Sequence, residues 1–209
     1  MLERLFPELL RRYEPKFPLV EIELSEGTSR EHRQRLADGE IDFAVIPRPA
    51  DPRFASRSLP ALTVLAAIPI ARRADWRESV PVESLSDTPV LVLHEGYISR
   101  QLFDSACRLA HVRSRIVLES GAPRTILALA EAGRGIAIIP STISVDDRTL
   151  DVIPVTHRGE ILDIRASLCW VERQFIAPYV AVFIEELIQV ANEKLPIFAT
   201  MAGGESMEQ

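Results

Sequence analysis

Short apolar runs of strand length alternate with amphipathic segments of helix length, and this alternation restarts after one long apolar stretch. The strand-like runs are residues 20–24, 41–46, 89–93, 115–119, 135–140 and 161–171, and the helix-like segments are 2–13, 28–38, 99–110, 124–133 and 177–195. Such an alternation predicts an α/β fold built on parallel sheets. Because the apolar run 62–71 separates two similar halves, two lobes are expected.

Several of these segments carry boundary signals of their own. Pro7 suits the first turn of the first helix, where a missing N–H costs little. Residues 28–31 (TSRE) match a capping box at the start of the second helix. Residues 20–24 (VEIEL) alternate apolar and charged side chains, which predicts a strand with one wet face, whereas 41–46 (IDFAVI) indicates a strand buried on both faces.

The glycine pair in residues 128–141 (ALAEAGRGIAIIPS) raises the possibility of a nucleotide site. A dinucleotide fingerprint runs strand, glycine turn, helix, because the phosphate needs the N-terminus of the helix. Here the order is helix, glycine, strand. We therefore expect Gly133 to end the helix in the left-handed conformation and Gly135 to open the next strand.

Composition excludes several classes of protein. With 24 basic and 30 acidic residues the formal net charge is −6, so the chain has no overall attraction to nucleic acid. No apolar run approaches the roughly 18 residues that span a bilayer, and the charged N-terminus is unlike a signal peptide. The sequence predicts a cytoplasmic protein without membrane contact, with Cys107 and Cys169 reduced and buried and with a disordered tail at 197–209.

No catalytic constellation is visible in the sequence. The histidines are scattered without metal-ligand spacing, and the G-x-S-x-G motif of serine hydrolases is absent. We therefore expect neither an enzyme nor a bound metal or cofactor. The four histidines are His32, His94, His111 and His157.

The segment around the glycine pair, LALAEAGRGIAIIPS (127–141), resembles a signature of LysR-type transcriptional regulators. Two further segments are similar to that family: LFPELLRRYEPKFPLVEIELSEGTSREHRQRLADGEIDFAVI (5–46) and ESLSDTPVLVLHEGYISRQLFDSAC (83–107). The resemblance covers residues 5–172, and the order and spacing of its pieces make it specific.

The resemblance implies the family's effector-binding domain, which has the fold of type 2 periplasmic binding proteins. In that fold two Rossmann-like α/β lobes are joined by two crossover strands, and a small molecule binds between them. Lobe I would comprise residues 1–65 and 168–196, and lobe II residues 66–167. The crossovers would be the run 62–71 and the strand that ends near Val171.

Parts of the family's design are expected to lie outside residues 1–209. The winged helix-turn-helix has no counterpart, so DNA would be bound only through a domain absent from this chain. The chain also starts after the family's first strand, which would lie between the strands expected at 20–24 and 41–46. Because unpaired buried backbone groups cost roughly 1–3 kcal/mol each, lobe I is expected to be the less stable lobe.

The resemblance and the helix starts together nominate residues that contact the effector. Helix N-termini attract anions, so a small anionic effector is expected. The alternative roles are structural: Thr28 as a helix cap, Ser99 as the cap of the helix at 99–110, and Arg48 as ordinary surface. The candidates are Thr28, Ser29, Pro47, Arg48, Tyr97, Ile98, Ser99 and Arg100.

The family also implies a homodimer or tetramer in which lobe I of one subunit packs against lobe II of the next. The expected contact surfaces are the first helix, with Leu5 and Leu9, and the helix at 100–110. Two other functions stay open at this point. One is the solute-binding protein of a transporter, and the other is an enzyme on the same fold.

Overall fold

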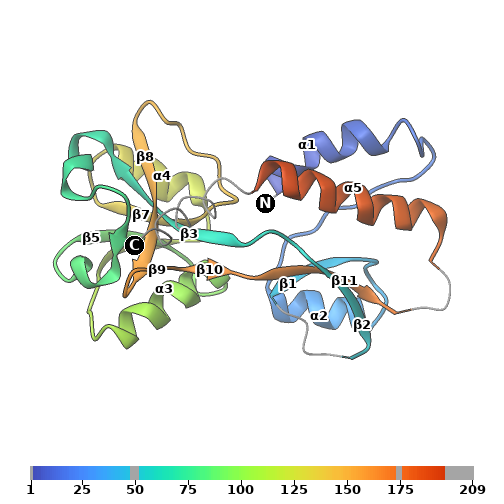
Figure 1. Cartoon of the computed structure of the whole chain (residues 1–209), viewed down its shortest axis with the longest axis horizontal. Helices are drawn as coiled ribbons and strands as arrows, with labels where there is room; N and C mark the ends of the chain where they lie inside the picture. The colour runs from blue at the N-terminus through green and yellow to red at the C-terminus, as the bar shows by residue number, and fades with distance from the viewer. Residues whose placement is uncertain (1, 48–51, 173–175, 196–209) are drawn as a thin grey trace, which may run out of the picture. The chain divides into compact units, whose positions relative to one another are not determined.

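The computed structural model describes residues 2–47, 52–172 and 176–195 (Figure 1). Two compact units emerge: unit 1 contains residues 1–61 and 165–197, and unit 2 contains Leu62–Ile164. Arg48 and the tail at 197–209 lie outside the described residues.

Unit 1 is a small sheet with three helices. The sheet has the strand order β1-β11-β2, and both pairings are antiparallel. Helix α1 runs beside α5 (Figure 1), and the Tyr13 hydroxyl of α1 donates to the Tyr179 carbonyl of α5 at 3.0 Å. The elements are α1 (Leu2–Tyr13), α2 (Ser29–Ala37), β1 (Ala44–Pro47), β2 (Phe54–Ser58), β11 (Ala166–Val171) and α5 (Pro178–Lys194).

Three predictions for this unit are wrong. Residues 20–24 form no strand, because in the described part of the chain they have no β partner, and Leu24 is exposed. The strand expected at 41–46 begins only at Ala44, and its residues are alternately buried and half-buried. Segments 20–24 and 41–46 do not pair with each other among the described residues, and the strand expected between them stays a prediction. Pro7 lies in the second turn of α1, so the helix begins earlier than its proline suggests.

The surfaces proposed for dimer contact also need correction. Leu5 and Leu9 are 1% and 0% exposed, because they are part of the buried core of unit 1. A buried side chain is not available to a second subunit, so Leu5 and Leu9 do not offer this contact. On the second candidate helix, Leu109 is 66% exposed.

Unit 2 is a larger, mixed sheet with the strand order β4-β8-β3-β7-β5-β6. Strands β5, β6 and β7 are parallel to one another, but β3 is antiparallel to both β7 and β8. The prediction of purely parallel sheets is therefore wrong. The elements are β3 (Leu62–Pro69), β4 (Val80–Pro81), β5 (Pro89–Leu93), α3 (Ile98–Leu109), β6 (Arg115–Ser120), α4 (Pro123–Glu131), β7 (Ile136–Pro140), β8 (Leu150–His157), β9 (Glu160–Ile161) and β10 (Asp163–Ile164), with 3₁₀ turns at Ile70–Asp75 and Val82–Leu85.

Burial explains the long apolar run. All eight residues of β3 are buried, because the strand lies between β7 and β8 inside the sheet. The single strand expected at 161–171 is broken into β9, β10 and β11, of which only β11 belongs to unit 1. Within the described residues, no helix combines the length and apolar character needed to cross a membrane.

The glycine pair forms a helix-to-strand turn, as predicted. Gly133 has φ of +73°, and its N–H donates to the Ala130 carbonyl at 2.8 Å, which ends α4. Gly135 is required for another reason. A Cβ atom there would lie 2.5 Å from the Pro89 carbonyl oxygen, so β7 and β5 approach too closely for any side chain at this position.

Candidate functional site

Buried polar side chains gather at one edge of unit 2. The carboxyl ends of β5, β6 and β7 meet there because the three strands are parallel, and antiparallel β3 begins at the same edge. In α/β sheets, ligands bind outside the carboxyl ends of such strands. Five of the seven buried polar residues among those described lie at this edge: Thr63, Ser99, Arg100, Ser141 and Thr142.

The loop after β5 is tied to the loop after β6. The Tyr97 hydroxyl donates to the Gly121 carbonyl at 2.9 Å, and the Gly96 N–H donates to His94 Nδ1 at 3.1 Å. Tyr97 is the N-cap of α3, and its side chain makes no capping hydrogen bond. The expectation that Ser99 caps this helix is wrong, because α3 begins at Ile98 and places Ser99 inside its first turn.

Arg100 is engaged within unit 2. Its Nε atom lies 2.9 Å from both carboxylate oxygens of Asp104, and its Nη1 donates to Glu119 at 2.7 Å and to the Leu93 carbonyl at 3.0 Å. Burial by itself lowers the pKa of Arg100, but the hydrogen bonds to Glu119 and then Asp104 outweigh it and raise that pKa above its ordinary value. The guanidinium therefore joins α3 to β5 and β6 and carries no unbalanced charge.

A second group of polar residues stands where β3, β7 and β10 meet. The Thr63 N–H donates to Ser141 Oγ at 3.1 Å, and the Ser141 N–H donates to the Thr63 carbonyl at 2.8 Å. The Thr63 hydroxyl donates to Asp163 Oδ1 at 3.1 Å. None of these residues was predicted from the sequence to belong to the site. The available signal was that Ser141 and Thr142 directly follow a strand parallel to β5.

The candidates in unit 1 have structural partners. The Thr28 N–H donates to Glu31 Oε2 at 2.7 Å, and the Glu31 N–H donates to Thr28 Oγ1 at 3.3 Å, which confirms the capping box. The Thr28 N–H and the Thr28 hydroxyl, which donates to Glu31 Oε2 at 2.9 Å, lower the pKa of Glu31. Pro47 ends β1, and its carbonyl accepts a hydrogen bond from Arg33 at 2.9 Å.

The structure thus brings together Tyr97, Ile98, Ser99 and Arg100 at one edge of unit 2. Thr28, Ser29 and Pro47 belong to unit 1. In the described ranges no group of three or more His, Cys, Asp or Glu residues could hold a metal ion. Cys107 and Cys169 are free and buried, as predicted, and burial raises the pKa of both thiols, that of Cys169 to about 11.

Comparison with known sequences places the chain in a family. The family model described as the LysR substrate binding domain matches residues 1–192. The transcriptional regulator AlsR of Bacillus subtilis is 28% identical over 155 residues, which cover 73% of this chain and 50% of AlsR. IlvR of Caulobacter vibrioides is 31% identical over 168 residues, 73% of this chain and 55% of IlvR. The chain thus spans about half the length of these relatives.

Solved structures agree with the family match. The regulatory domain of Synechocystis CcmR, in complex with 2-PG, has a TM-score of 0.76 at 16% identity and covers 91% of this chain and 92% of its own. The effector-binding domain of QuiR, in complex with shikimate, has a TM-score of 0.68 at 15% identity, with 90% of each chain covered. These likenesses confirm the predicted α/β fold, that of type 2 periplasmic binding proteins.

Proposed function

Because this chain belongs to the LysR substrate-binding domain family, we propose that it is the effector-sensing part of a LysR-type transcriptional regulator. In this proposal unit 1 corresponds to lobe I and unit 2 corresponds to lobe II. Under this proposal the chain binds a small metabolite in the cytoplasm, catalyses no reaction, and meets DNA only through a helix-turn-helix domain outside residues 1–209.

One observation carries the proposal: the polar residues at the carboxyl edge of unit 2. Ser99 is 2% exposed and lies in the first turn of α3, whose N-cap side chain makes no hydrogen bond to that turn. The first N–H groups of a helix remain available to a ligand when no side chain caps them. A hydroxyl beside such N–H groups suits an oxygen-rich metabolite.

The effector that fits this edge best is a small anion. The positive end of the α3 dipole favours negative charge. Arg100 does not serve as the direct counter-ion, because Asp104 and Glu119 already balance it. We therefore assign the anion to backbone N–H groups and the Ser99 hydroxyl, with Arg100 as the residue that holds α3 in place.

Ligand titration tests this assignment. A panel of metabolite carboxylates and phosphates that includes shikimate, the QuiR ligand, is screened by thermal shift and then by amide NMR. A ligand at 100 times its Kd stabilises the protein by about 2.7 kcal/mol. Ser99→Ala should weaken binding of the hit, whereas Ser86→Ala, at an exposed serine of the same unit, should not. Equal affinity in both variants would reject the site.

The same titration extends to unit 1. We propose that Thr28, Ser29 and Pro47 also contact the effector. Thr28→Val removes the hydroxyl but also removes the helix cap, so Thr28→Ser serves as the control that keeps both. Loss of affinity in Thr28→Val, with unit 1 still folded and with wild-type affinity in Thr28→Ser, supports the contact. Unchanged affinity in Thr28→Val excludes Thr28 as a ligand.

We also propose a homodimer through the edge of unit 2 that β6 forms. This strand ends the sheet, and Ile116 and Val117 on it are each 42% exposed, as is nearby Leu109 at 66%. Exposed apolar edge strands favour pairing with another chain. Val117→Lys should shift sedimentation toward the monomer. Ile70→Lys, at a residue 49% exposed elsewhere in unit 2, should not. A monomeric wild-type chain at high concentration would contradict the dimer, and a four-chain species would extend it to a tetramer.

A further inference from the structure

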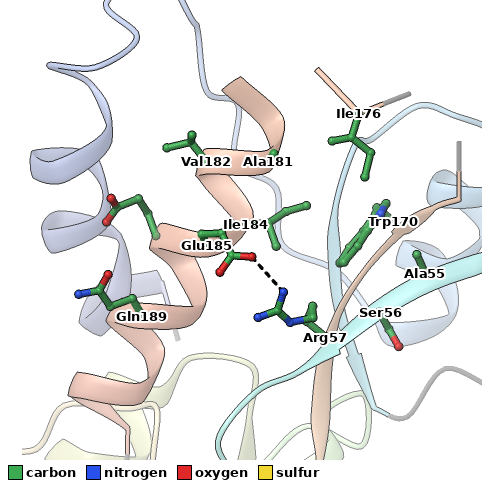
Figure 2. A pocket seen from close by; sticks show the side chains of 11 residues that line it. Ala55, Ser56, Arg57, Trp170, Ile176, Ala181, Val182, Ile184, Glu185 and Gln189 are labelled. Carbon is green, nitrogen blue, oxygen red and sulfur yellow. Dashed lines mark hydrogen bonds and ion pairs between the residues drawn. The ribbon is translucent and has the colours of Figure 1, made fainter. Parts of the chain in front are cut away.

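Unit 1 contains a groove that the proposed function does not use. It has a volume of about 440 Å³ and lies between helix α5 and strands β2 and β11. Figure 2 shows Ile184 of α5 on one wall and the Trp170 ring of β11 on the other. Ligand pockets are typically about 300–1,000 Å³ and mostly apolar, with a few polar groups that fix orientation. The groove has a volume in this range and a largely apolar lining, and it is open to solvent on the side of Arg57 and Glu185.

Two opposite charges stand together on this groove. Arg57 of β2 and Glu185 of α5 both line it, and Arg57 Nη1 lies 2.9 Å from Glu185 Oε1 (Figure 2). Their side chains are 50% and 65% exposed, so the pair contributes little to stability and opens at low cost. The neighbouring carboxylate, Glu186, is already paired with Lys16 at 2.5 Å.

We propose that this groove binds an α-amino acid with a branched or aromatic side chain. The apolar side chain lies between Trp170 and Ile184. The carboxylate accepts hydrogen bonds from Arg57, and the ammonium group donates to Glu185. The zwitterion thereby replaces one exposed ion pair by two, each of which is charge-assisted.

Charge matching selects this class over its close relatives. A simple carboxylic acid would take Arg57 and leave the Glu185 carboxylate without a counter-ion. A simple amine would take Glu185 and leave Arg57 alone. A neutral apolar molecule would use the Trp170 wall but would leave the ion pair across the groove in place.

The two tryptophans of the chain make the test specific to the groove. Trp170 lines it, whereas Trp76 lies in unit 2 and donates its indole N–H to Ser84 Oγ at 2.9 Å. The indole N–H signals are followed in ¹⁵N-labelled wild-type protein, with Trp170→Phe used only to assign them. L-phenylalanine should shift the Trp170 signal in a saturable way and leave Trp76 unchanged. We expect 3-phenylpropanoate and 2-phenylethylamine each to bind about fivefold more weakly, a difference of about 1 kcal/mol.

Variants separate the charges from the apolar wall. Arg57→Gln and Glu185→Gln should each weaken the binding of L-phenylalanine about fivefold. Ala181→Leu should abolish binding, because the larger side chain fills the groove. Residue 181 is exposed on α5, and leucine is a good helix former, so the helix should tolerate the change. Glu14→Gln, at an exposed carboxylate just after α1 and outside the groove, is the matched control and should bind like the wild type.

Several outcomes would overturn the proposal. The first is that 3-phenylpropanoate or 2-phenylethylamine binds as tightly as L-phenylalanine. The second is that the indole N–H signal of Trp170 does not shift up to the solubility limit of L-phenylalanine. The third is that Ala181→Leu leaves the binding of L-phenylalanine unchanged. A Trp170 signal that changes with protein concentration alone would show that a second copy covers the groove. If L-phenylalanine shifts only signals around Ser99, the ligand belongs to the proposed effector site. This inference then fails while the proposed function stands.

Discussion

Replacing Arg100 by methionine should lower the free energy of unfolding of unit 2 by about 3 kcal/mol. The guanidinium is 7% exposed, and its two carboxylate partners, Asp104 and Glu119, are 28% and 37% exposed. Methionine keeps much of the side-chain volume and removes the charge, the ion pairs and the donor to the Leu93 carbonyl. The change therefore isolates the polar network from packing.

The expected loss of about 3 kcal/mol follows from the polar groups that lose Arg100 as their partner. Removing one partner of a buried ion pair costs roughly 3–5 kcal/mol, and a buried carbonyl that loses its donor costs roughly 1–3 kcal/mol. These costs overlap, and water reaches Asp104 and Glu119 once Arg100 is gone, so the lower end of the range applies. Arg108→Met, at an exposed arginine of the same helix, is the control and should change stability by less than about 0.5 kcal/mol.

Pulsed thiol labelling in urea measures this effect unit by unit. Cys107 reports on unit 2 and Cys169 on unit 1, and both are buried and slow to react while their unit is folded. In Arg100→Met the labelling midpoint of Cys107 should fall to lower urea. The reasoning is refuted if Arg100→Met and Arg108→Met give the same midpoint, or if only Cys169 responds.

Two further predictions concern a turn and an ion pair. Gly135→Ala should destabilise unit 2 by about 1–3 kcal/mol in urea unfolding, because the new Cβ would lie 2.5 Å from the Pro89 carbonyl oxygen. Gly121→Ala, which has open space at its Cβ, is the control and should lower the free energy of unfolding by less. Equal losses in the two variants would argue against the close approach of β7 and β5. The pKa of Glu8 is lowered from 4.5 to about 2 by hydrogen bonds from Arg11 and Arg12, so its contribution to stability is full above pH 4.5 and is lost as the pH falls toward 2. In an NMR titration of the double variant Arg11→Gln/Arg12→Gln, the pKa of Glu8 should return toward 4.5. An unchanged pKa would show that the two arginines do not cause the lowering.

Hydrophobic periodicity located the elements whose packing is local. Strand β5 and the succession of α4, Gly133 and β7 were expected close to their observed bounds, because apolar spacing and the glycine turn specify them within a few residues. Strand β8 was missed because Pro154 interrupts its pattern, and prolines usually argue against an inner strand. Its neighbours β3 and β4 lie far away in sequence, so local pattern carries little information about it.

The opposite error occurred at residues 20–24. Their alternation is that of a strand, but a strand also needs a neighbour to receive its hydrogen bonds. In the candidate site, too, the local pattern predicted some features, while contacts between segments distant in sequence determined others. The place of Ser99 after a strand was readable from the sequence, whereas the neutralisation of Arg100 was not, because Glu119 lies on another strand, 19 residues away.

The path of the chain through the two units implies an order of folding. Among the described residues, unit 1 is split in sequence, and unit 2 lies between its two segments as one insertion, Leu62–Ile164. The ends of the insertion meet where Leu62 pairs with Ile164, next to the contact in which the Leu59 N–H donates to the Ala166 carbonyl. Closing a flexible loop of about 100 residues costs about 4 kcal/mol of chain entropy beyond a constant term. An already folded insertion removes most of that cost, so we expect unit 2 to fold first and the two sequence segments of unit 1 to come together after it.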